Sequence, residues 1–293
     1  MADFIKISFS PRVWGWSLNM SLKNATATRE GGGVVQPFIM RIRSVLIAAG
    51  LLSGVLLSQT QPRAPGSRRD DPQPRAVDPG PPGGPPSDAI VLFDGKDLSQ
   101  WTSRDGAPLR WRVEGGAIVS GSVTKEPGKT QDLISKQRFG SAQIHVEFAV
   151  PYMPNQKDQA RGNSGVYLQG RYEIQILDSY NNPTYPNGSC AALYGRFPPL
   201  VNASRPPEQW QTYDIIFHPP KCAEDGKFAQ PGTLTLLHNG VLVQDHVPVV
   251  STRACNPEPG PLLLQDHYHP DAPNTPIRFR NIWVRPLEDA PTP

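Results

Sequence analysis

The stretch GNSGVYLQGRYEIQILDS, Gly162 to Ser179, decides the fold because it predicts two β-strands joined at Gly170. Side chains of a strand alternate between its two faces, so Glu173 and Gln175 share one face. The apolar side chains of the same strand share the other face: Tyr172, Ile174 and Ile176. Such a hairpin has one face to bury, and a polar face that is either solvated or part of a site.

A third polar residue follows this strand. Asp178 is out of phase with Glu173 in a regular strand, but one β-bulge near Leu177 would return it to the same face. Glu173, Gln175 and Asp178 would then line one groove. Two alternatives stay open, because Asp178 can instead cap a turn and Gln175 can form a cross-strand hydrogen bond.

The remainder of the chain favours strands and loops. Its 293 residues include 34 Pro and 26 Gly, and no long helical periodicity is present. Many short strands without crossover helices predict an all-β protein, an antiparallel jelly-roll sandwich. Asn239-Gly240, between two apolar runs, predicts a tight hairpin. The predicted strands span 90–93, 109–121, 132–137, 142–150, 164–169, 172–177, 210–218, 233–247, 261–267 and 277–286.

The N-terminal region resembles an export signal. Met40-Arg-Ile-Arg-Ser precedes the apolar run from Val45 to Leu57, which is too short for a comfortable membrane span. We expect a signal peptide at 40–60, with translation starting at Met40 and residues 1–39 a misassigned or disordered extension. The protein would then be secreted or periplasmic, and membrane-attached only if the signal stays uncleaved.

Residues 61–87 are rich in Pro, Gly, Arg and Asp and predict a disordered linker. The folded domain is expected at 88–288, with a short tail at 289–293. A formal net charge of +3, with several Arg residues inside the linker, argues against nucleic acid as a partner. No nucleotide cofactor is expected, and the oligomeric state stays open.

Three cysteines lack the CxxC spacing of a thiolate zinc site. In an exported protein one disulfide and one free thiol are expected. Cys222 and Cys255 are the preferred pair because both lie in loop-like, Pro-rich contexts, which leaves Cys190 free.

Six motifs follow one another in a recognisable order: LFDGKDLSQW (Leu92 to Trp101), WRVEGGAIVSG, the stretch from Asn163 to Ser179, LHNG, LLLQDH and FRNIWVRPL (Phe279 to Leu287). Together they resemble the 3-keto-disaccharide hydrolase family, formerly a domain of unknown function. The resemblance covers nearly all of 89–287. It implies the concanavalin A-like lectin/glucanase sandwich, and an exported hydrolase acting on glycosides whose C3 hydroxyl is oxidised to a ketone.

A C3 ketone acidifies the hydrogen on C2, so the glycosidic bond can be cleaved by proton abstraction and elimination, followed by hydration. This route needs a base, an electrophile and an acid. We predict Glu173 as the base, with His267 and Asp178 as further catalytic residues. The predicted substrate-binding residues are Asn163, Tyr167, Gln175, Gln265 and Arg280.

Two questions stay open at this point. Glu173 and His267 could instead hold a divalent metal that polarises the ketone, although no third ligand is evident. The alternatives to a hydrolase are a non-catalytic lectin-like module that binds carbohydrate, and a lyase or hydratase that performs only the elimination or only the hydration.

Overall fold

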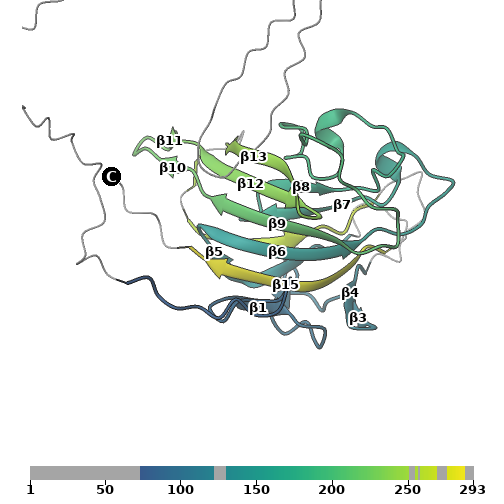
Figure 1. Ribbon diagram of the computed structural model, residues 1–293, viewed down its shortest axis with the longest axis horizontal. Helices are drawn as coiled ribbons and strands as arrows, with labels where there is room; N and C mark the ends of the chain where they lie inside the picture. The colour runs from purple at the N-terminus through teal and green to yellow at the C-terminus, as the bar shows by residue number, and fades with distance from the viewer. Residues whose placement is uncertain (1–72, 122–129, 251–254, 257, 269–275, 288–293) are drawn as a thin grey trace, which may run out of the picture. The chain divides into compact units, whose positions relative to one another are not determined.

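The computed structural model describes residues 73–121, 130–250, 255–256, 258–268 and 276–287. Two antiparallel sheets pack face to face (Figure 1). The eight-stranded sheet has the order β13 (Val241–Val249), β12 (Gly232–His238), β9 (Gln211–His218), β6 (Ala142–Ala149), β15 (Arg278–Pro286), β4 (Ala117–Val119) and β3 (Arg112–Glu114), with β1 (Ile90–Phe93) also pairing with β15.

The five-stranded sheet carries the hairpin from which the sequence analysis started. Its order is β2 (Trp101–Thr102), β5 (Leu133–Phe139), β14 (Gly260–Leu264), β7 (Ser164–Leu168) and β8 (Tyr172–Ile176). A separate two-stranded ribbon is formed by β10 (Lys221–Cys222) and β11 (Phe228–Gln230), and two short 3₁₀ helices are η1 (Asp158–Ala160) and η2 (Pro186–Gly188).

The core lies between the two sheets because each strand turns alternate side chains inward. Buried and half-buried residues alternate along all of β9 and β12. Large side chains that fill the interior include Trp101, Phe148, Tyr213, Phe217 and Phe279. Burial of each such side chain stabilises the fold by about 1.5–3 kcal/mol.

The two predicted hairpins form with tight turns. Leu168 pairs with Tyr172 across the β7–β8 turn, and Gln169 and Gly170 both have positive φ angles, of 51° and 62°. Asn239 and Gly240 do the same between β12 and β13. Positive φ at both central residues is the geometry whose twist matches that of the flanking strands.

The all-β antiparallel sandwich predicted from the sequence is confirmed, and the strands match the predicted ranges closely. The structure adds three short strands that the pattern did not reveal, β2, β10 and β11. Two or three residues are too few to show alternation.

Part of the segment expected to be a linker is described, from residue 73. It lies against the outer face of the eight-stranded sheet, where the Gly83 carbonyl accepts a hydrogen bond from the Asn281 side chain at 2.7 Å. Arg75 and Arg285 both pair with Asp88. Residues 1–72, which contain the predicted signal, and 288–293 lie outside the described residues.

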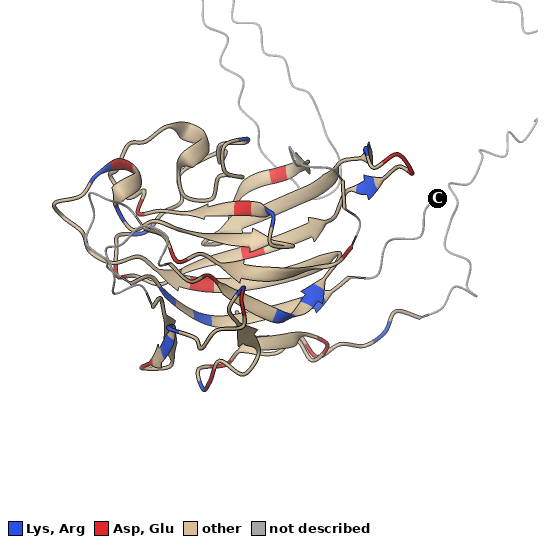
Figure 2. Cartoon of the chain, turned by 180° about the vertical axis from the view of Figure 1, so that it is seen from behind, with Lys and Arg blue, Asp and Glu red and all other residues tan. Residues whose placement is uncertain are grey.

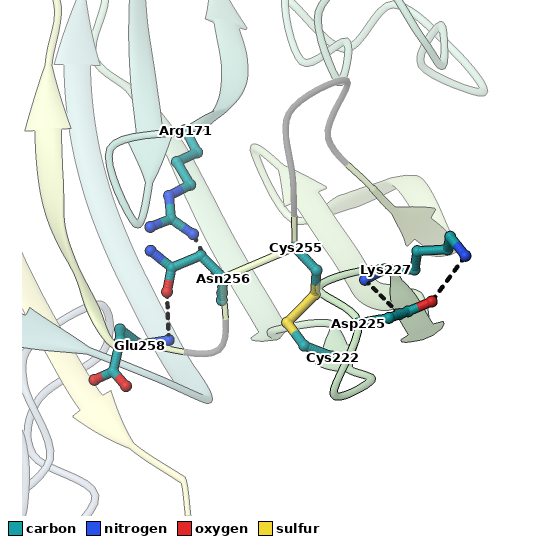
Figure 3. Close-up of a disulfide and its surroundings, with 7 residues drawn as sticks. All are labelled: Arg171, Cys222, Asp225, Lys227, Cys255, Asn256 and Glu258. Carbon is teal, nitrogen blue, oxygen red and sulfur yellow. Dashed lines mark hydrogen bonds and ion pairs between the residues drawn. A yellow bond between two sulfur atoms is a disulfide. The ribbon is translucent and has the colours of Figure 1, made fainter.

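Cys222 and Cys255 form a disulfide (Figure 3), with Cα atoms 5.6 Å apart, which confirms the preferred pairing. Cys190 is buried and free, and its Sγ lies 3.1 Å from the Tyr213 hydroxyl. Burial raises the pKa of the Cys190 thiol.

Positive and negative side chains are interspersed over the domain (Figure 2). None of the helices in the described ranges has the length and apolar character needed to cross a membrane.

Candidate functional site

Glu173, the second residue of β8, projects into a cavity of about 520 Å³ on the outer face of the five-stranded sheet. Pairing of β7 with β8 and with β14 brings Tyr167 between Glu173 and Leu263 in the cavity floor. A volume of this size suits a disaccharide-sized ligand. The polar residues that line the cavity with Glu173 are Arg104, Asp132, Tyr167, Arg171, Tyr194 and Arg196.

The Glu173 carboxylate leans over β7, where the chain has a glycine. A β-carbon built at Gly165 would lie 2.6 Å from a carboxylate oxygen of Glu173, so only glycine leaves the room that the carboxylate occupies. The Tyr167 hydroxyl hydrogen-bonds with Glu173 and accepts a hydrogen bond from Gln265 Nε2 at 3.0 Å. A chain from Gln265 through Tyr167 therefore fixes the carboxylate.

Burial raises the pKa of Glu173 to about 7, the hydrogen bond from Tyr167 opposes this shift, and the negative charge of Asp132 adds to it. A carboxyl group with such a pKa is about half ionised at neutral pH, where it accepts a proton efficiently. Burial and the Glu173 charge raise the pKa of Tyr167, so its hydroxyl stays a neutral donor.

Three guanidinium groups line the same cavity as Glu173. Arg104 Nη2 lies 3.4 Å from Asp132 Oδ2, and the other oxygen of Asp132 accepts a hydrogen bond from the backbone of Asp266. Arg171 and Arg196 also line the cavity. The site therefore combines a proton acceptor with a cation, Arg104, that can stabilise an oxyanion.

An exposed tyrosine pair borders the cavity. The backbone N–H of Tyr194 donates to the Glu173 carbonyl at 3.0 Å, which aligns the segment from Leu193 with β8. The Tyr194 and Tyr185 hydroxyls are 2.8 Å apart. Aromatic rings of this kind offer a surface on which a sugar ring stacks.

Gln265 and Tyr167 are the predicted binding residues that lie beside Glu173. His267, two residues beyond Gln265, is half-buried and is not among the described residues that line the cavity. Its catalytic role stays a prediction. His269, which would share its face in an extended strand, lies outside the described residues.

Gln175 and Asn163 lie beneath the neighbouring loops rather than in this cavity. Gln175 has an exposed fraction of only 1%, and its Nε2 donates to Gln159 Oε1 at 3.1 Å. Asn163 Nδ2 donates to the Gln159 carbonyl at 2.9 Å. Both amides hold η1 in place, so the predicted groove of three polar side chains does not form.

Asp178 caps a turn, which was the alternative reading of this residue. No bulge carries it back to the face of Glu173, because β8 ends at Ile176. Its side chain is 1% exposed, pairs with Arg161 Nε at 2.9 Å and accepts a hydrogen bond from the Tyr180 backbone. Burial raises its pKa and Arg161 opposes the shift.

The expectation that Arg280 reaches the site is corrected by the structure. Arg280 lies on β15 with its side chain away from the core, opposite to that of buried Phe279. Its Nε is 2.5 Å from Glu147 Oε2, and its guanidinium lies 4.1 Å from the Trp210 ring centroid. It therefore occupies the outer face of the other sheet, across the sandwich from Glu173.

Sequence reasoning missed five polar residues of the cavity: Arg104, Asp132, Arg171, Tyr194 and Arg196. Arg171 could have been found, because it precedes Glu173 by two residues and alternation sends both to the same face. The others come from segments distant in sequence, and only strand pairing brings them together.

The described ranges contain no group of three or more His, Cys, Asp or Glu side chains placed to hold a metal ion. The hypothesis that Glu173 and His267 share a divalent metal therefore stays a prediction.

Comparison with known proteins shows the family to which the chain belongs. Residues 88–285 match the model of the 3-keto-alpha-glucoside-1,2-lyase-like domain. A crystal structure from Parabacteroides distasonis, provisionally named a glycosyl hydrolase, is 43% identical, covers 75% of this chain and 95% of its own, and has a TM-score of 0.68. A second protein of that organism with the same provisional name is 20% identical, covering 68% and 94%, with a TM-score of 0.47. No curated protein matches the chain.

Proposed function

Because the chain belongs to the family of 3-keto-alpha-glucoside-1,2-lyase-like domains, we propose that it cleaves glycosides oxidised to a ketone at C3, with Glu173 as the general base. The observation that carries the proposal is the Glu173 carboxyl group, whose pKa is about 7, in a sugar-sized cavity lined by arginines. An acid with a purely structural role is normally stabilised in its ionised form, which lowers its pKa. The pKa of Glu173 is raised instead, so this group exchanges a proton near neutral pH.

The reaction begins when the Glu173 carboxylate takes the proton from C2. The electron pair of the C2–H bond moves toward the C3 carbonyl, whose oxygen becomes an enolate. The enolate then expels the glycosidic oxygen from C1, and that oxygen takes up a proton from a water molecule as the aglycone leaves. Glu173 returns the proton taken from C2 to the solvent. Addition of water across the new C1=C2 bond places hydroxyl on C1 and hydrogen on C2, so that the net change is hydrolysis.

The other groups of the cavity serve this sequence. Tyr167 orients the Glu173 carboxylate and tunes its pKa. Arg104 pairs with Asp132, whose negative charge also acts on Glu173. Arg104 is the cation that stabilises the enolate oxygen. Removal of one such stabilising group from an active site typically costs ~10²–10³ in kcat.

The test compares a 3-keto-disaccharide with the same disaccharide before oxidation. We expect monosaccharide release from the keto substrate alone, with loss of turnover in E173Q. Equal turnover of the unoxidised disaccharide would refute the role of the ketone. Absorbance of the enone distinguishes a lyase, which accumulates it, from a hydrolase, which hydrates it, and binding without either product would favour the lectin-like module.

Export is a second part of the proposal. The disulfide between Cys222 and Cys255 supports it, since disulfides persist mainly in oxidising compartments. Fractionation of cells that express the chain from Met40, followed by N-terminal sequencing of the product, tests it. A mature N-terminus near residue 60 outside the cytoplasm is expected, and an intact N-terminus in the cytoplasm would refute it.

A further inference from the structure

The cavity holds more positive charge than the proposed chemistry needs. Three arginines line it against two carboxyl groups, and one of these, Glu173, is partly protonated at neutral pH. Elimination from a 3-keto sugar develops one negative charge, on the enolate oxygen. Arg104, paired with Asp132, stabilises that charge. Arg171 and Arg196 therefore have no role in the proposed chemistry.

Arg171 is held by neutral groups. Its Nη1 donates to the Asn256 carbonyl at 3.2 Å (Figure 3), and it hydrogen-bonds with Tyr172. Neither partner carries a negative charge, so the cation remains uncompensated while its position is fixed. A guanidinium fixed in this way has lost rotamer freedom before any ligand arrives, which favours bidentate binding of a carboxylate.

The disulfide supports this arrangement. Cys255 directly precedes Asn256, the residue whose carbonyl holds Arg171, and is bonded to Cys222 of β10. The Asn256 side chain also accepts a hydrogen bond from the Glu258 backbone at 2.8 Å (Figure 3). The covalent bond therefore anchors the carbonyl that orients a cavity cation.

Arg196 lies at the same end of the cavity. Both side chains line the cavity, and the segment that carries Arg196 runs beside β8, because Leu193 pairs with Ile174 and the Tyr194 N–H donates to the Glu173 carbonyl. The positive charges of Arg171 and Arg196 both act on the Tyr172 hydroxyl. Arg196 is exposed and forms no ion pair within the described ranges. Arg171 lies in the turn directly before β8 and precedes Glu173 by two residues, a separation of about 7 Å in extended chain. That spacing is close to the length of one sugar ring.

We infer that Arg171 and Arg196 form an anion subsite and that the preferred substrate carries a carboxylate on the sugar next to the 3-keto ring, as in a glycoside of a uronic acid. The inference rests on the proposed function for the position of the 3-keto ring over Glu173. The aglycone then extends toward the turn at Gly170, where its carboxylate meets the two guanidinium groups.

The experiment measures kcat/KM for two matched substrates, a 3-keto-glucoside of glucose and a 3-keto-glucoside of glucuronic acid. We expect the acidic substrate to be favoured at least ten-fold at low salt, with the preference falling severalfold as added salt screens the exposed Arg196. In R196Q and R171Q the preference falls toward unity through KM, while the neutral substrate is little affected. R112Q, which removes an exposed arginine on β3 outside the cavity, is the matched control and keeps the preference.

The disulfide is tested by the double variant C222A/C255A. If the bond positions Arg171, KM for the acidic substrate rises while kcat and the neutral substrate are unchanged. Loss of activity with both substrates alike would show a purely structural role and overturn that part of the inference.

Failure of the inference is distinguishable from failure of the proposed function. Equal turnover of the two substrates overturns the anion subsite and leaves the function standing. If neither substrate is turned over, the proposed function fails, and calorimetry with glucuronate and glucose then decides the subsite. Tighter binding of glucuronate that is lost in R196Q supports the subsite, and equal or absent binding overturns it.

Discussion

The carboxylate of Glu173 occupies the space above Gly165, on the neighbouring strand, that the β-carbon of any other residue would fill. The separation of 2.6 Å between that β-carbon and the carboxylate oxygen is too short for both to coexist. The ring of Tyr167, 3.0 Å from the same point, closes the other side. The absence of a side chain at Gly165 therefore sets the position of the proposed base.

Replacement of Gly165 by alanine tests this relationship. The added methyl group displaces the Glu173 carboxylate, and a misplacement near 1 Å typically costs roughly 10²-fold in rate. We expect kcat to fall by one to two orders of magnitude with the fold retained by circular dichroism. G140A is the control, because a β-carbon at Gly140 meets no atom within 4 Å. Equal activity of the two variants would contradict the finding.

The pH dependence of kcat/KM reports the state of Glu173. A general base acts when deprotonated, so activity rises with pH through the pKa of about 7. An acidic limb near pH 4.5, the ordinary value for a glutamate, would contradict a general base held at the raised pKa.

Two substitutions shift that limb in opposite directions. Y167F removes the hydrogen bond that lowers the pKa of Glu173, so the limb moves to higher pH. D132N removes a negative charge that raises the same pKa, so the limb moves to lower pH. Rate profiles of both variants measured in one buffer series check the signs. Shifts in the same direction would exclude Glu173 as the titrating group.

E173Q makes the folded state more stable at alkaline pH. In the wild type the pKa of Glu173 is higher in the folded state, about 7, than the ordinary 4.5. The folded state thus binds more protons between these values, and stability falls as pH rises from about 4.5 to 7. The full difference corresponds to roughly 3 kcal/mol above pH 8, so urea unfolding at pH 8 should show E173Q gaining up to that amount. The gain disappears below pH 4.5, and an equal gain there would point to a cause other than ionisation.

Loss of the disulfide destabilises the domain. The bond closes a loop with a sequence separation of 33 residues, which corresponds to about 3–4 kcal/mol of unfolding free energy in the chain-entropy account. We expect the unfolding free energy of C222A/C255A to be lower by that amount, with a correspondingly lower urea midpoint. C190A, which removes the free buried thiol, is the control: a reducing agent should lower the unfolding free energy of this variant as much as that of the wild type. A reducing agent that does not destabilise wild type would contradict this.

The sequence predicts the sandwich well because its signals are local. Alternation in β9 and β12, and the pairs of residues with positive φ at Gln169-Gly170 and Asn239-Gly240, arise within short windows of chain. The same alternation predicts the strand face on which Glu173 lies. It does not predict the other residues of the cavity, because Asp132 and Arg196 reach it only through strand pairing and a loop that aligns with β8.

Residues that the sequence placed together separate for equally physical reasons. Gln175 shares the face of Glu173, but the loops at η1 and η2 cover that end of β8 and bury it. Arg280 was expected near Glu173 because a guanidinium on the last strand can bind a sugar oxygen or form a bidentate pair with that carboxylate. It belongs instead to the opposite sheet, where Glu147 neutralises it.

The most direct test follows the hydrogen on C2. Wild-type protein and E173Q are incubated in D₂O with a 3-keto-disaccharide, and the released 3-keto sugar is analysed by proton NMR against a control without enzyme. Abstraction by Glu173 predicts deuterium at C2 in the product of the wild type, and neither exchange nor cleavage above the control in E173Q. Release of a sugar that retains its original C2 hydrogen would contradict the account.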